Sequence, residues 1–198
     1  MIDLFAIPVH KGRVIPTEEE KKGTDELLEE IWSTVSPGTW GGETGLSSGE
    51  ISLMLQKDTR LEWMLKPMWE AAKMYWDHLG YVPDSRIIAE SCWVNLHRKG
   101  DMTKEHSHNG GAAGVHIASV YYYKKTKDNS DLEFVDPLDY IKRMTPIGGK
   151  MNDQLLGKTV PTDQYDFLMF PSWVRHRVSP NPVDDARIAI SVNWVGGI

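Results

Sequence analysis

Six short segments with strand-like patterning fill the second half of the chain, and they constrain its fold more than any other feature. They cover residues 86–97, 115–124, 131–135, 165–170, 174–179 and 187–195, and turns that contain glycine or proline separate them. Many short strands that follow a helical start are typical of a β-sandwich or barrel backed by helices.

The first 85 residues carry helical patterning instead. Thr17 and Glu20 have the spacing of a capping box that opens a helix, and we expect Gly23 to interrupt this helix. The most regular helical pattern covers 58–79, where apolar residues recur at three- and four-residue intervals. Pro67 lies inside this segment and is expected to kink or break the helix.

Two further segments of the first half lack a helical pattern. Residues 2–9 are predicted to be extended, and residues 37–50 form a Gly/Ser-rich loop of a length that is often functional. We therefore predict a single domain, 1–198, that is mainly β with flanking helices. Residues 1–85 would form a mostly helical scaffold, and residues 86–198 would form the β core.

Composition excludes several classes of function. The formal net charge is -6, so the chain lacks the basic surplus of nucleic-acid-binding proteins, and we expect no nucleic-acid partner. The chain shows neither a signal peptide nor an apolar run long enough to span a membrane, so we expect no membrane partner. Cys92 is the single cysteine, which excludes an intramolecular disulfide and fits a reducing, cytoplasmic setting.

Three histidines form a candidate metal site. His106 and His108 are two residues apart, so on an extended strand their imidazoles point to the same side. His176, on a later predicted strand, could supply a third ligand. Iron(II), zinc and copper all accept imidazole. The alternative is that the first two are solvated histidines of a loop.

A candidate anion site lies on the last predicted strand. Arg187, Ala189, Ser191 and Asn193 share one face of 187–195, whereas the other face is wholly apolar. A buried arginine needs an anion, and a guanidinium beside a hydroxyl suits a carboxylate. The anion is either a ligand or an Asp or Glu of the protein.

The ordered set of these motifs resembles the 2OG-Fe(II) oxygenase family, within the Fe(II)/2-oxoglutarate-dependent dioxygenases. No single motif is decisive, but the set extends over nearly the whole chain in the family's order. The matching segments are Asp3–Pro8, Trp93–Asn95, Glu105–His108, Val120–Tyr123, Phe170–His176 and Arg187–Asn193.

The resemblance implies a double-stranded β-helix, or jelly roll, backed by N-terminal α-helices. It implies an Fe(II) ion held by His106, His108 and His176. His108 stands where most of the superfamily has Asp or Glu, which departs from the usual set of two histidines and one carboxylate. Glu105 and Asp101 are the nearby carboxylates that could replace it as the third ligand.

The resemblance also implies a site for the cosubstrate 2-oxoglutarate. Arg187 would bind the distal carboxylate with help from Ser191 and from one phenol of the triple tyrosine. Spacing favours Tyr122, although Tyr121 and Tyr123, on the opposite face, are alternatives. Asn95 is expected to line the cavity or to bond the backbone.

The implied activity is hydroxylation of an unidentified small-molecule or peptide substrate, with release of succinate and CO2. Loops at 37–50 and 136–163 would shape the substrate pocket, and a homodimer is an admissible oligomeric state.

Two other functions fit parts of the pattern. The interval from Gly100 to His106 resembles a cupin, and a cupin-like three-histidine iron dioxygenase needs no 2-oxoglutarate. However, Ala112 and Ala113 stand where a cupin has Glu, and this reading gives Arg187 no task. A non-enzymatic jelly-roll binding module would instead present exposed aromatic residues near positions 40 or 173.

Overall fold

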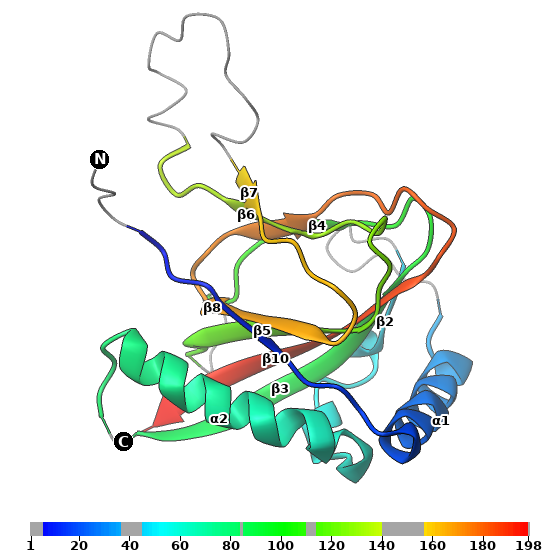
Figure 1. Cartoon of the computed structure of the whole chain (residues 1–198), viewed down its shortest axis with the longest axis horizontal. Helices are drawn as coiled ribbons and strands as arrows, with labels where there is room; N and C mark the ends of the chain where they lie inside the picture. The colour runs from blue at the N-terminus through cyan, green and yellow to red at the C-terminus, as the bar shows by residue number, and fades with distance from the viewer. Residues whose placement is uncertain (1–5, 37–44, 84, 110–113, 140–156, 198) are drawn as a thin grey trace, which may run out of the picture.

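The computed structural model of the chain describes residues 6–36, 45–83, 85–109, 114–139 and 157–197. Within these ranges two α-helices and ten strands form, and the strands make two sheets that face each other (Figure 1). The prediction of a mainly β fold with flanking helices is confirmed.

The larger sheet has six antiparallel strands. In spatial order they are β1 (His10–Arg13), β8 (Asp166–Pro171), β5 (Ile117–Lys124), β10 (Arg187–Gly197), β3 (Arg86–His97) and β2 (Leu46–Ser47).

The smaller sheet has four antiparallel strands, in the order β4 (Thr103–His106), β9 (His176–Val178), β6 (Leu132–Val135) and β7 (Gly157–Thr159). From β3 to β10 the chain passes repeatedly between the two sheets. This is the path of a jelly roll, so the predicted double-stranded β-helix is confirmed.

Strands with alternating apolar residues were the predictable ones. β3 coincides with the predicted 86–97, and β10 begins at Arg187 as expected. Four strands have polar or very short sequences and escaped prediction, namely β1, β2, β4 and β7. The extended segment expected at 2–9 lies partly outside the described residues, and the strand near it begins only at His10.

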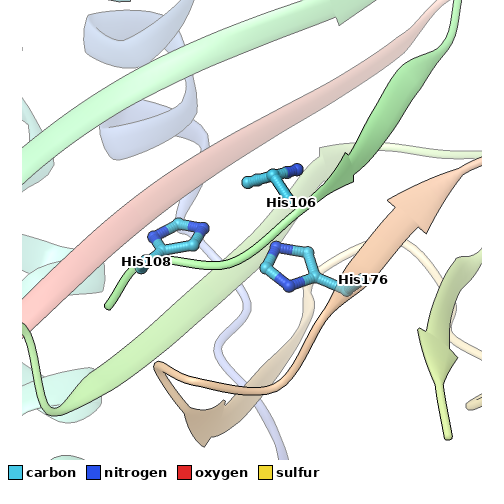
Figure 2. Close-up of side chains that lie close together, drawn as sticks. All are labelled: His106, His108 and His176. Atoms are coloured by element: carbon cyan, nitrogen blue, oxygen red, sulfur yellow. The ribbon is translucent and has the colours of Figure 1, made fainter. Parts of the chain in front are cut away.

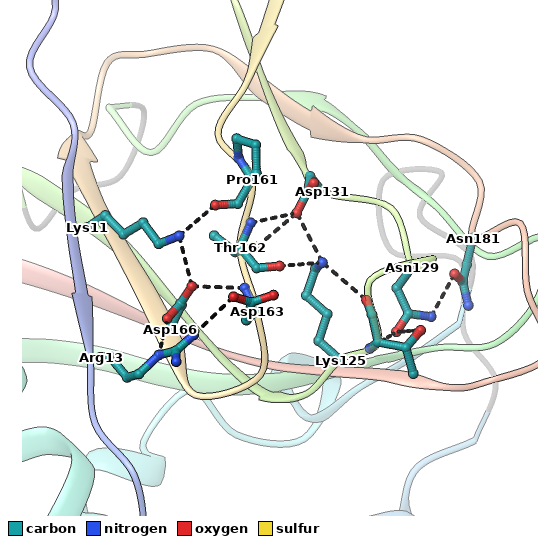
Figure 3. A network of polar contacts seen from close by, with 11 residues as sticks. Lys11, Arg13, Lys125, Asn129, Asp131, Pro161, Thr162, Asp163, Asp166 and Asn181 are labelled. Carbon is teal, nitrogen blue, oxygen red and sulfur yellow. Dashed lines mark hydrogen bonds and ion pairs between the residues drawn. The ribbon is translucent and has the colours of Figure 1, made fainter.

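β1 is held by charge as well as by backbone pairing. The Arg13 guanidinium donates to Asp166 at 2.6 Å, and the Lys11 ammonium lies 3.0 Å from the same carboxylate (Figure 3). Asp166 is on β8, the strand that pairs with β1. A mixed sequence such as His-Lys-Gly-Arg therefore becomes a strand through partners that lie about 150 residues away in the chain.

Helix α1 (Glu18–Thr34) begins with the predicted capping box, in which the Thr17 hydroxyl accepts from the Glu20 amide and Glu20 accepts in return. The expected interruption at Gly23 is wrong, because α1 is continuous. The next residue, Thr24, is fully buried and its hydroxyl donates to Glu20 O at 2.8 Å. One glycine costs a helix only ~1 kcal/mol, which this burial offsets.

Helix α2 (Glu62–His78) begins a few residues later than predicted, after three short 3-10 turns at Ser48–Glu50, Leu55–Lys57 and Thr59–Leu61. No break occurs at Pro67, which is exposed while Met64 and Met68 on either side are fully buried. The first of these turns, together with β2, also replaces part of the loop predicted at 37–50, whose residues 37–44 lie outside the description.

Two apolar layers build the core, and β10 contributes to both. Its residues Ile188, Ile190, Val192 and Trp194 pack outward against the helices, in one cluster with Met64 and Met68 of α2. Ala189, on the other face, packs between the sheets with residues such as Tyr122 and Phe170. The predicted alternation of β10 therefore places Arg187, Ser191 and Asn193 toward the inside of the jelly roll.

Candidate metal centre

Three histidines converge between the sheets. His106 ends β4, His176 begins β9, and the two residues are paired across these neighbouring strands. His108 lies beyond the end of β4, where its amide donates to Ser172 O at 2.8 Å. One ring nitrogen from each histidine lies within 4.8 Å of those of the other two (Figure 2). This is the group of residues in the described chain that could hold a metal ion.

Hydrogen bonds leave the Nε2 atoms available as ligands. His106 Nδ1 lies 2.8 Å from Lys104 O, and His176 Nδ1 lies 2.9 Å from Val174 O. A carbonyl can only accept, so Nδ1 of each ring carries the proton and Nε2 keeps its lone pair. His108 Nδ1 lies 2.6 Å from Asn193 Oδ1, and His108 Nε2 is buried with no partner among the described residues.

The surroundings keep the rings of His108 and His176 neutral. Burial lowers the pKa of His108 to about 4, although the bond to Asn193 opposes this. Burial lowers the pKa of His176 well below its ordinary value, and the neighbouring His106 and His108 lower it further. Neutral imidazole is the form that binds a metal ion.

The alternative carboxylate ligands are not part of this group. Glu105 accepts from Arg175 at 2.7 Å, and Asp101 accepts from the Arg98 amide at 2.8 Å. Neither belongs to the cluster that could hold an ion among the described residues.

A cavity of about 610 Å³ opens beside the three histidines. Six of the seven predicted site residues line it, and these are Asn95, His106, His108, His176, Arg187 and Ser191. Its volume is within the range of sites for small organic ligands. The sequence therefore identified one continuous pocket from segments spread over about a hundred residues.

Arg187 lines this cavity without an acidic partner in the described chain. It is 2% exposed, its Nε has no hydrogen-bond partner, and one of its terminal nitrogens lies 3.5 Å from His97 Nδ1. Lys125 is the contrasting case, since this buried ammonium lies 3.1 Å from the Asp131 carboxylate and donates to Thr162 O at 2.7 Å (Figure 3). Arg187 is thus the buried cation that is available to an anion from outside.

Tyr122 lies behind the cavity wall rather than on it. Its ring centroid is 5.0 Å from the Arg187 guanidinium carbon, and its hydroxyl is buried without a hydrogen-bond partner among the described residues. Burial raises the pKa of Tyr122, and the nearby Arg187 cation partly opposes the rise. Tyr121 and Tyr123 point to the opposite side of β5, where their hydroxyls donate to Val14 O and Asp25.

Two cavity residues were missed by the sequence analysis as members of the site. His97 contacts Arg187, and burial together with the Arg187 charge lowers its pKa to about 4. Asn193 contacts His108. A signal for His97 exists, because it lies two residues after Asn95 on β3 and thus on the same face.

One remaining prediction concerned exposed aromatic residues as the mark of a binding module. Trp173 is 45% exposed, whereas position 40 lies outside the described residues. Among the described residues, no helix has the length and apolar character needed to cross a membrane.

Solved structures with the same fold are numerous. A crystal structure of a prolyl-4-hydroxylase from Pseudomonas putida matches 95% of this chain and 92% of its own, with a TM-score of 0.65 and 11% identity. The epimerase SnoN from nogalamycin biosynthesis, in complex with Fe3+, alpha ketoglutarate and nogalamycin RO, matches 96% of this chain and 79% of its own, with a TM-score of 0.63 and 14% identity. At these identities the likeness concerns the fold alone.

The sequence itself decides the family. A search of curated proteins gives no match. The family model described as "Putative 2OG-Fe(II) oxygenase" matches residues 91–193, which is just over half of the chain and includes every predicted site residue. The chain therefore belongs to the 2OG-Fe(II) oxygenase family, and it is an enzyme that uses Fe(II) and 2-oxoglutarate.

Proposed function

We propose that this oxygenase hydroxylates a small-molecule or peptide substrate while 2-oxoglutarate is converted to succinate and CO2. One oxygen atom of O2 enters the substrate and the other enters succinate. The observation that carries the proposal is the distribution of buried polar atoms without a partner. Of the five such side-chain atoms in the described chain, four belong to Asn95, His108, Tyr122 and Arg187.

Unpaired buried polar atoms are costly, and a native protein keeps them where a ligand or ion completes them. His108 Nε2 belongs to the metal group, whereas Arg187 lines the same cavity without belonging to that group. A pocket that offers both a metal group and an unpaired buried cation suits Fe(II) and a dicarboxylate.

In this proposal His106, His108 and His176 hold the iron through Nε2. Three neutral ligands leave the full charge of the ion in place, and the carboxylate of 2-oxoglutarate beside the metal would offset part of it. Bound Fe(II) would supply oxygen activation and electron transfer, while the protein supplies orientation and a largely dry cavity. The fit rests on the neutral rings and on the free Nε2 atoms described above.

Arg187 would bind the distal carboxylate of 2-oxoglutarate, with Ser191 beside it on the same face of β10. The Tyr122 hydroxyl, which needs an acceptor, would donate to the same carboxylate or to a water beside it. Asn95, on the neighbouring strand β3, would donate from Nδ2 to the cosubstrate, and its unpaired Oδ1 would accept from a substrate donor or a water. These four groups determine orientation, because none of them reaches the metal cluster.

The identity of the substrate is left open by this proposal. Leu53 and Trp93 contribute apolar surface to the cavity wall, and the segments 37–44 and 140–156 lie outside the described residues. The proposal includes a cytoplasmic, reducing setting and no nucleic-acid or membrane partner, and it allows a homodimer.

Spectroscopy of the anaerobic complex tests the proposal. Purified protein with Fe(II) and 2-oxoglutarate should develop the metal-to-ligand charge-transfer absorption of the chelate. His176→Ala should abolish iron loading. Arg187→Ala should leave loading intact but weaken 2-oxoglutarate binding, as read from the intensity of the band. Iron loading without a band would favour the three-histidine dioxygenases that need no 2-oxoglutarate. No iron binding by the wild-type chain would favour a binding module.

A further inference from the structure

We infer that Asn193, held by Ser91, is a positioning residue that makes His108 a metal ligand. Asn193 Oδ1 lies 2.6 Å from His108 Nδ1, and Asn193 Nδ2 donates to the Ser91 hydroxyl at 3.0 Å. The inference rests on the proposed metal site and adds to it the reason why a histidine serves at position 108.

His108 differs from the other two histidines in what fixes its ring. His106 and His176 each donate Nδ1–H to a backbone carbonyl two residues earlier, so the backbone alone determines which nitrogen is free. His108 lies past the end of β4, and its ring is bonded instead to a side chain. Its hydrogen-bonding state therefore depends on residue 193.

An amide side chain could hold the ring in either of two states. With Oδ1 toward His108, Nδ1 carries the proton and Nε2 is free for a metal ion. With the amide reversed, Nδ2 would donate to Nδ1, and the proton would move to Nε2. Nε2 faces the metal group, where the described chain offers it no hydrogen-bond acceptor, and a protonated Nε2 cannot bind a metal.

Ser91 and the sheet hold Asn193 in place. Ser91 and Asn193 are paired across β3 and β10, and the register of the two strands shifts between Asn193 and Trp194. Ser91 is buried, so its hydroxyl is not freely exchanged for water as the partner of Asn193 Nδ2. Trp93 adds a stacked contact with the His108 ring, at 5.8 Å between centroids and 28° between planes. The hydrogen bond to Asn193 and the stacked Trp93 ring thus both restrict the orientation of the His108 imidazole.

The amide also keeps the site neutral. A carboxylate at position 193 would accept the same Nδ1–H bond but would add a negative charge behind the ligand and make the imidazole more basic. Asn193 orients His108 without that charge. This matters because the ligand that would occupy the site is itself an anion.

Cobalt(II) affinity and the histidine tautomer test the inference together. In anaerobic competition titrations we expect Asn193→Leu to bind Co(II) about 10- to 100-fold more weakly than wild type, as for the loss of other outer groups that support metal ligands. Asn193→Asp retains the acceptor and should stay close to the wild-type affinity. Asn109→Leu is the control, since Asn109 is exposed and adjacent in sequence to His108 but, among the described residues, bonds only Ser107.

The tautomer is read from 15N spectra of metal-free protein with labelled histidines, which requires no activity. The wild-type His108 signal should show the proton on Nδ1, and Asn193→Leu should lose that preference. A wild-type proton on Nε2 overturns the inference, as does an Asn193→Leu affinity equal to that of Asn109→Leu. If Asn193→Leu does not fold, the wild-type tautomer and the Asn193→Asp affinity still decide. If wild type binds no Co(II), the proposed metal site fails, and this outcome is distinct from a wrong tautomer.

Discussion

Replacing Arg187 by methionine should change the stability of the ligand-free protein and the stability of its complex with 2-oxoglutarate in different directions. The substitution removes the guanidinium and keeps an unbranched side chain in a position that is 2% exposed. No acidic side chain in the described chain pairs with Arg187, so its charge is largely uncompensated without a ligand. A buried charge of this kind is unfavourable, and its removal should leave the ligand-free protein equally stable or more stable.

The complex should respond in the opposite direction. Loss of one partner of a buried, hydrogen-bonded charge pair costs ~2–5 kcal/mol, which corresponds to roughly 30- to 5,000-fold weaker binding of 2-oxoglutarate. Ligand at about 100 times its Kd stabilises a folded protein by ~2.7 kcal/mol. For a chain of 198 residues this raises the Tm of wild type by ~5–11 °C. Arg187→Met should lose most of that rise at the same concentration.

Thermal unfolding with and without 2-oxoglutarate, in the presence of a redox-inert metal ion, measures both effects. Arg86→Met is the matched control, because Arg86 is an exposed arginine at the start of β3. The reasoning is refuted if Arg187→Met keeps the full ligand-dependent rise. It is equally refuted if the ligand-free variant is several kcal/mol less stable, since Arg187 would then be a structural cation.

Three further predictions concern stability. The pKa of His97 is about 4 in the folded protein and about 6.5 in the unfolded chain. Between these pH values the unfolded chain binds one proton more than the folded protein, so lowering the pH from 6.5 to 4 should reduce the free energy of unfolding by about 3 kcal/mol. His97→Gln should remove that share of the pH dependence in urea titrations. Met68→Ala, at a fully buried position on α2, should cost ~2–5 kcal/mol, whereas Met74→Ala, 62% exposed on the same helix, should change urea midpoints little. Thr17→Ala removes the capping hydroxyl of α1 and should cost ~0.5–2 kcal/mol by thermal unfolding; an unchanged Tm would contradict the cap.

The parts of the fold that were predictable are those in which local pattern and tertiary burial agree. β10 alternates because one face packs on the helices and the other lines the cavity, so its residues record both environments. The sequences of β1 and β4 show no such alternation, because their strand conformation comes from pairing with β8 and β9. The predicted interruption at Gly23 was wrong for a similar reason, since the burial of Thr24 outweighs the low helix propensity of glycine.

The candidate site divides in a similar way. Residues whose chemistry is unusual at their position, such as a buried arginine or two histidines two residues apart, were visible in the sequence. His97 and Asn193 act through another side chain rather than through a ligand. Their importance depends on a contact of 3.5 Å with Arg187 and of 2.6 Å with His108; spacing can place His97 on the face of Asn95, but it does not identify either contact.

The inward face of β10 has a consequence for how this chain can change over evolution or by design. Arg187, Ser191 and Asn193 line one pocket from a single strand, where Arg187 is the candidate anion-binding residue and Asn193 contacts the candidate metal ligand His108. Every second residue of this strand faces the pocket. Side chains on this face can be exchanged one at a time, but inserting or deleting one residue would turn every later residue of the face to the helix-packed side. Single substitutions on this face therefore keep the spacing of the lining residues along the strand, whereas a one-residue insertion or deletion does not.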